Sequence, residues 1–209
     1  MREKTHSAPT FRRSLQRVTA GEVRAWSSER WLKDEDALKL STSSSAASRI
    51  NSFCVLLMER IFRFPIKVGK GSIDVLGHTN NKEYLRWMEE AALAHSDSLG
   101  WTMGRYLEIG KVFVASTHKI EYLRPTFEDD ELTMLTWVET MDGAKSRRCF
   151  YLKRDNKVCM QGWTEWTFVD LKSGRAADIS DEVKKDFPLV PADDPELKAA
   201  GVRRSPSLI

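Results

Sequence analysis

The sequence predicts an α+β fold in which an antiparallel sheet of about five strands packs on a single long helix. Two observations carry this prediction. Between residues 80 and 99, apolar residues recur at helical spacing with charged residues elsewhere on the turn. Between residues 61 and 170, the remaining segments alternate apolar and polar residues, and short turn sequences join most of them as in hairpins.

Composition divides the 209-residue chain near residue 58. Residues 1–57 start with an Arg-rich, acid-poor stretch and contain a Ser/Ala run at 41–48, so we expect a poorly structured N-terminal extension. An organelle transit peptide is an alternative interpretation, although acidic residues from position 22 onward depart from that pattern. Met58 is an alternative natural start. We expect the folded domain at 58–190 and a C-terminal tail at 191–209.

The domain begins with a strand expected at 61–68, where Pro65 indicates an edge strand or a strand end. A glycine-bracketed irregular segment follows and contains Asp74. The long helix is expected to start at Asn80 or Asn81, because asparagine is a favoured N-cap, and to end near Gly100. Its apolar face is expected to consist of Tyr84, Trp87, Met88, Ala91 and His95.

Further strands are expected after the helix. They are separated by the turn sequences Arg124-Pro125, Asp142-Gly143 and Arg154-Asp155-Asn156, which favour a reversal of the chain. A last turn at 171–175 leads to a short closing helix. The expected strands cover residues 112–123, 131–140, 146–153 and 158–170, and the closing helix covers 180–185.

Charge and cysteine content narrow the classes of function. The net charge of +3 is small against 33 basic and 30 acidic residues, so nothing demands a nucleic-acid partner. Cys54, Cys149 and Cys159 lie at no zinc or redox spacing, which favours inert thiols in a reducing, cytoplasmic compartment. No apolar run approaches the roughly 20 residues of a membrane span, so stable membrane insertion is not expected.

Asp74 is the first candidate for chemistry. It lies shortly before the expected helix, whose first N–H groups lack partners and attract developing negative charge. A carboxylate at such a place can act on a polarised carbonyl. By local chemistry alone, an aspartate before a helix is more often a cap or a turn residue. His95 and His118 have no carboxylate or cysteine at ligand spacing, so no metal site is expected.

Four stretches resemble hotdog-fold acyl-CoA thioesterases of the 4-hydroxybenzoyl-CoA thioesterase type. The first is Asp-Val-Leu-Gly-His-Thr-Asn-Asn-Lys-Glu-Tyr-Leu-Arg-Trp-Met-Glu-Glu-Ala at 74–91, and the others lie at 120–125, 130–132 and 168–175. The match covers about residues 60–187. The resemblance implies that the sheet wraps around the central helix. It also implies a homodimer, or a homotetramer, with active sites at the dimer interface, an acyl-CoA substrate and no cofactor.

The resemblance also implies roles for individual residues. Asp74 would be the catalytic carboxylate, acting either as general base on water or as nucleophile, and both routes stay open. The backbone N–H of Asn81 would stabilise the oxyanion. Gly77 would allow the turn that brings the thioester to the helix end.

Other residues of the signature have less defined roles. Some family members carry a histidine where this chain has Asn81, whereas the chain places His78 earlier, in a Gly-His-Xaa-Asn-Asn variant that resembles long-chain acyl thioesterases. His78 is therefore a secondary catalytic candidate. Asn80, Tyr84 and Glu89 are candidates for substrate binding. Basic residues that could bind the phosphates of CoA are Lys119, Arg124, Lys145, Arg147, Arg148 and Arg154.

Two other functions are compatible with the same residues. A hotdog-fold enoyl-CoA hydratase or dehydratase would use an acid–base pair, and Asp74 with His78 is superficially similar to one. A catalytically idle dimer that binds acyl-CoA is the second alternative. Thiol release separates hydrolysis from both.

Overall fold

The computed structural model describes residues 60–208, so the extension expected at 1–57 lies outside the described part of the chain. Here η denotes a short 3-10 helix. In chain order the elements are β1 (Phe62–Lys67), η2 (Lys70–Ser72), α2 (Asn81–Ser98), α3 (Met103–Glu108), β2 (Lys111–Tyr122), β3 (Glu131–Asp142), β4 (Lys145–Arg154), β5 (Lys157–Asp170), β6 (Arg175–Ala176), α4 (Asp181–Asp186), α5 (Pro195–Ala199) and η3 (Pro206–Leu208).

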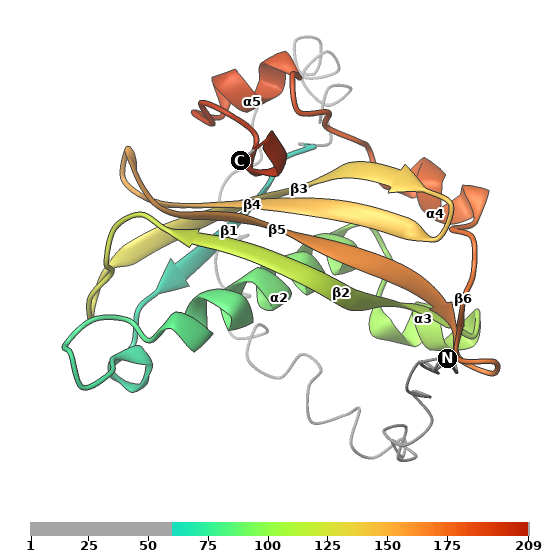
Figure 1. The fold of residues 1–209 in the computed structure, drawn as a ribbon, viewed down its shortest axis with the longest axis horizontal. Helices are drawn as coiled ribbons and strands as arrows, with labels where there is room; N and C mark the ends of the chain where they lie inside the picture. Colours follow the sequence, from blue (N-terminus) through green and yellow to red (C-terminus); the bar gives the residue numbers. More distant parts are fainter. Residues whose placement is uncertain (1–59, 209) are drawn as a thin grey trace, which may run out of the picture. The chain divides into compact units, whose positions relative to one another are not determined.

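The five long strands form one antiparallel sheet in the order β1-β3-β4-β5-β2, and the two-residue strand β6 pairs with β5. Hairpins join β3 to β4 and β4 to β5, as the turn sequences predict. Pro65 lies in β1, which is an edge strand, and faces Thr133 of β3. A missing backbone N–H is tolerated in an edge strand. The predicted α+β architecture is confirmed (Figure 1).

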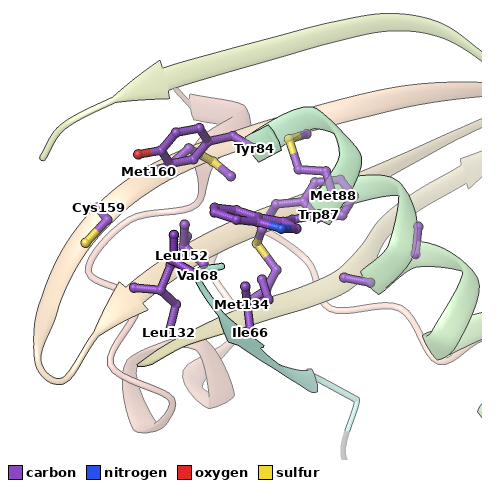
Figure 2. Close-up of a cluster of buried hydrophobic side chains, with 13 residues drawn as sticks. Ile66, Val68, Tyr84, Trp87, Met88, Leu132, Met134, Leu152, Cys159 and Met160 are labelled. Atoms are coloured by element: carbon purple, nitrogen blue, oxygen red, sulfur yellow. The ribbon is translucent and has the colours of Figure 1, made fainter. Parts of the chain in front are cut away.

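Helix α2 lies across one face of the sheet (Figure 1). Asn80 caps it, because the Asn80 side-chain oxygen accepts a hydrogen bond from the Lys82 N–H at 3.0 Å. The apolar stripe of the helix then packs on inward side chains of the strands. Figure 2 shows Tyr84, Trp87 and Met88 directed from α2 toward Leu132, Met134, Leu152 and Met160.

The opposite face of the sheet is also covered. Burial runs almost without interruption along the middle of β3 and β4, which indicates apolar contacts on both sides. The residues expected to form a C-terminal tail, from 191 onward, include α5 and η3. Leu197 and Val202 of this segment pack against Trp137 and Tyr151 on this outer face. Residues 191–208 therefore belong to the folded domain.

Helix α3 is an element that the sequence pattern did not predict. Thr102 caps it by accepting a hydrogen bond from the Arg105 N–H at 3.3 Å. The Arg105 guanidinium lies 3.7 Å from the centroid of the buried Trp101 ring.

Within residues 60–208, no helix is long and apolar enough to cross a bilayer.

Candidate active site

Asp74 lies in a tight loop between η2 and α2. The backbone N–H of Asp74 donates to the His78 carbonyl at 2.9 Å, and the Gly77 N–H donates to the Asp74 carbonyl at 3.1 Å. A β-bridge between Ile73 and Thr79 closes the base of this loop. Gly77 has φ of +80°, a conformation that a residue with a Cβ adopts only with strain. The glycine is therefore required by the turn itself.

The Asp74 carboxylate has two different oxygen environments. Its Oδ1 atom accepts a hydrogen bond from the Leu76 N–H at 2.8 Å, which is the turn-forming role expected of a local aspartate. Its Oδ2 atom lies 3.8 Å from Nδ1 of His78, too far for a hydrogen bond but close enough for electrostatic attraction if the imidazole is protonated. The Asp74 side chain keeps 22% of its surface exposed, so it is partly accessible.

The start of α2 offers one unused donor. Asn80 occupies the capping position and its side chain is engaged with the Lys82 N–H, while the Glu83 N–H donates to the Asn80 carbonyl. Among the described residues, the N–H of Asn81 has no hydrogen-bond acceptor, as expected for the first residue of a helix. This N–H lies at the positive end of the helix dipole and is suited to an oxyanion.

A cavity of about 200 Å³ opens beside the helix start. Tyr122 bounds it from the end of β2: its hydroxyl donates to the Asn81 carbonyl at 3.4 Å, and its ring packs edge-to-face on Tyr84 at a centroid distance of 5.1 Å. The cavity joins the helix start to the β2 end of the sheet. Its lining residues are His78, Thr79, Asn81, Tyr84, Tyr122, Leu123, Arg124 and Pro125.

A chain of buried hydroxyls fixes the base of this cavity. The Thr126 hydroxyl donates to the Thr79 hydroxyl at 2.7 Å and is 2.9 Å from the Tyr84 hydroxyl. The Thr79 N–H also donates to the Thr126 carbonyl at 2.8 Å. Burial raises the pKa of Tyr84, so this phenol stays protonated. Its hydroxyl belongs to the framework that holds the Asp74 loop to the 123–130 connection.

The structure thus brings His78, Asn81 and Tyr84 together around one cavity, with Asp74 adjacent through His78. Glu89 is exposed on α2 and does not line this cavity in the single chain, so its substrate-binding role stays a prediction. Tyr122 was missed as a site residue. Its position directly before the Leu123-Arg124-Pro125 turn, at the end of a long strand, was the available signal.

The basic residues proposed for CoA binding separate into different environments. Arg124 is exposed and lines the cavity, with Nη1 donating to the Val158 carbonyl at 2.6 Å. Arg147 lies over the Trp163 ring at 4.8 Å. The expectation for Arg148 is wrong, because this residue is only 5% exposed and donates to Nδ1 of His95. Successive residues of a strand point to opposite faces, so Arg148 points inward where Arg147 does not.

Several known proteins resemble this chain in sequence or in fold. The sequence pattern of the Thioesterase-like superfamily matches residues 68–187. The long-chain acyl-CoA thioesterase FadM of Escherichia coli (strain K12) is 28% identical over 125 residues, which are 57% of this chain and 92% of FadM. The crystal structure of YbaW, a probable thioesterase from Escherichia coli, has a TM-score of 0.52 at 27% identity and covers 59% of this chain and 94% of YbaW.

A more distant structure shares the fold. A hypothetical protein of Staphylococcus aureus, solved in complex with CoA, has a TM-score of 0.58 at 12% identity, over 70% of this chain and 86% of that protein. The fold and the family match define a hotdog-fold thioester hydrolase. The chain belongs to the Thioesterase-like superfamily, which confirms the resemblance read from the sequence.

Proposed function

We propose that the protein is an acyl-CoA thioesterase that hydrolyses an acyl-CoA thioester to a free acid and CoA. The observation that carries the proposal is the accessible Asp74 carboxylate beside a helix start whose Asn81 N–H is free, at the edge of a cavity. The name of FadM, a long-chain acyl-CoA thioesterase, supports the substrate class. The CoA bound to the Staphylococcus aureus neighbour agrees with it.

The proposed chemistry needs a nucleophile and an oxyanion donor. In the general-base route, Asp74 takes a proton from water while the water oxygen attacks the thioester carbonyl carbon. In the nucleophilic route, the Asp74 oxygen attacks that carbon and the resulting anhydride is hydrolysed by water. In both routes the Asn81 N–H stabilises the oxyanion, the C–S bond breaks, and the CoA thiolate takes up a proton from solvent.

The cavity residues have supporting roles in this proposal. His78 lines the cavity and places its Nδ1 atom 3.8 Å from the unused oxygen of Asp74. The exposed Arg124 at the cavity gives a cationic group for the phosphates of CoA. Tyr84 and Tyr122 form an aromatic wall for the acyl or pantetheine portion.

We also propose that the functional unit is a homodimer joined through β2. Within residues 60–208, β2 pairs with β5 alone, so its 12 residues form a long edge of the sheet. Exposed apolar side chains lie close by in sequence, including Val114 on β2 and Leu107 and Ile109 before it. Light scattering at several concentrations tests this proposal, because a stable monomer at every concentration would contradict it.

A graded acyl-CoA panel tests the proposed reaction. Wild-type protein is incubated with thioesters of increasing chain length and with aromatic acyl groups, and free thiol is measured continuously. Parallel incubations with an enoyl-CoA measure hydration at the double bond. Thiol release with no hydration supports the proposal. Hydration without thiol release would identify the hydratase alternative, and binding without either would identify an idle acyl-CoA binder.

A further inference from the structure

A second cavity, of about 70 Å³, lies at the other end of α2. It is bounded by the C-terminal half of α2, by α3 and by the sheet, and Leu93 and Met103 at its edge are 40% and 45% exposed. The two cavities share no lining residue, and from Asn81 at one to Ser96 at the other the helix rises roughly 22 Å at 1.5 Å per residue, so they are distinct. Its lining residues are Ala92, Leu93, Ser96, Met103, Tyr106, Val112, Phe113, Val138, Met141, Ser146, Arg148, Trp166 and Phe187.

Arg148 makes this cavity unusual. Its side chain is buried and donates a hydrogen bond from Nη1 to Nδ1 of His95 at 2.7 Å. Within residues 60–208, no carboxylate forms an ion pair with Arg148. Burial lowers the pKa of Arg148 to about 10, so the guanidinium is still cationic at neutral pH. An unpaired buried cation is costly, and a bound anion would remove that cost.

His95 cannot supply the missing negative charge. Burial and the neighbouring Arg148 lower the pKa of His95 to about 3, so its imidazole is neutral. The neutral ring accepts one hydrogen bond from a guanidinium that has five N–H donors. The His95 ring is held in place by stacking on Phe62 at a centroid distance of 5.2 Å. Its hydrogen bond to Arg148 in turn orients the other N–H groups of the guanidinium.

Two further donors of the cavity wall are unsatisfied. In the described part of the chain, the Tyr106 hydroxyl and the Trp166 Nε1 are buried and make no hydrogen bond of standard geometry, although the Ser96 hydroxyl lies near Tyr106. Burial raises the pKa of Tyr106 to about 12, so its phenol keeps its proton. Buried polar groups are normally paired, and the three residues that carry these donors, Arg148, Tyr106 and Trp166, all line the same cavity.

We infer that this cavity is a binding site for a carboxylate carried on an apolar stem. The guanidinium of Arg148 matches a carboxylate in charge and planar geometry, and the Tyr106 and Trp166 donors supply further hydrogen bonds. The other walls, which include Ala92, Val112 and Phe113, suit a hydrocarbon portion. One water molecule needs about 15 Å³ of cavity volume measured in this way. The cavity of about 70 Å³ therefore has room for several heavy atoms.

Two classes of ligand could bring a carboxylate on an apolar stem into this cavity. One is a free carboxylic acid, which is the class of product that thioester hydrolysis releases. The other is an acyl-CoA whose acyl chain carries a second carboxylate at its far end, and this source rests on the proposed thioesterase function. Both place the same group against Arg148.

Titration calorimetry with hexanoate tests the site without any turnover. Hexanol is the uncharged probe and hexylammonium the oppositely charged one. We expect hexanoate to bind the wild-type protein at least tenfold more tightly than hexanol, and hexylammonium to show no binding. Equal affinity for hexanoate and hexanol would overturn the inference, because the guanidinium would then have no role.

Two methionine variants locate the binding. Arg148→Met keeps the length of the side chain and removes the charge, and we expect it to weaken hexanoate binding at least tenfold. Arg147→Met is the matched control on the opposite face of β4, and we expect wild-type affinity. Unchanged affinity in a folded Arg148→Met protein would overturn the inference.

A third variant keeps the test decisive if Arg148→Met does not fold. Tyr106→Phe removes a single hydroxyl that makes no standard hydrogen bond, so it is expected to fold and to bind hexanoate several-fold more weakly. Wild-type affinity in Tyr106→Phe, together with an unfolded Arg148→Met, would count against the site.

Acyl-CoA pairs of equal length, with and without a terminal carboxylate, separate the two sources. A higher kcat/KM for the carboxylated thioester that is lost in Tyr106→Phe assigns the site to the acyl end. Equal kcat/KM with retained hexanoate binding assigns it to free acid. If no thioester is turned over while hexanoate still binds, the proposed function fails and the site stands.

Discussion

His95→Gln should remove much of the acid sensitivity of this protein. His95 is 2% exposed, and the groups packed on it are Arg148, which donates to its Nδ1, and the rings of Phe62 and Phe187. Burial first, and then the charge of Arg148, lowers its pKa from 6.5 to about 3. A glutamine side-chain oxygen can still accept the Arg148 hydrogen bond, so the variant removes the titrating group and keeps the acceptor.

The sign of the effect follows from proton binding. Between pH 6.5 and about 3, the unfolded chain binds a proton at His95 and the folded chain does not. The contribution of His95 to stability is therefore complete above pH 6.5 and is lost progressively as the pH falls toward 3. The loss between pH 7.5 and pH 5 amounts to about 2 kcal/mol.

Urea unfolding at pH 7.5, 6, 5 and 4.5 measures this slope. We expect the free energy of unfolding of the His95→Gln protein to fall by about 2 kcal/mol less than that of the wild type between pH 7.5 and pH 5. His118→Gln is the matched control, because His118 is exposed on β2. A His95→Gln slope equal to that of the wild type would refute the reasoning about this buried imidazole.

Two further substitutions test the framework of the site. A Cβ at Gly162 would lie 2.3 Å from the Lys119 carbonyl oxygen, so Gly162→Ala should cost roughly 1–3 kcal/mol in urea unfolding, whereas Gly69→Ala, with nothing within 4 Å, should cost little. Thr126→Val leaves the buried Tyr84 hydroxyl without its partner and should cost about 1–3 kcal/mol. Wild-type urea midpoints for either variant would contradict the corresponding packing argument.

The sequence predicted those parts of the fold that depend on local pattern. Helix α2 and the five long strands have clear periodicities and turn residues, and their observed bounds differ from the expected ones by only a few residues. Helix α3 was missed because its six residues, Met103–Glu108, are too few for a periodic signal. The packing of Leu197 and Val202 on Trp137 was missed because it joins residues distant in sequence.

In the candidate site, too, the sequence predicted the residues that belong to a local pattern and missed those brought together by contacts between distant segments. Asp74, Gly77 and Asn81 were found because a continuous stretch resembles a family signature, and the positive φ of Gly77 gives a physical reason for its glycine. The contact of Tyr122 with Asn81 is between a strand end and a helix start, so no local pattern contains it. Arg148 was counted among the candidates for binding the phosphates of CoA because two adjacent arginines do not reveal which of them the strand turns inward.

The rate of thiol release by Asp74→Asn tests the central claim most directly. The substitution keeps the oxygen that accepts the Leu76 N–H and removes the negative charge. Asp129→Asn is the matched control, because Asp129 is exposed in a loop with φ of 66°, which asparagine tolerates. We expect Asp74→Asn to fold like the wild type and to lose nearly all acyl-CoA hydrolysis, with Asp129→Asn fully active. Wild-type turnover by folded Asp74→Asn across the acyl-CoA panel would contradict the account.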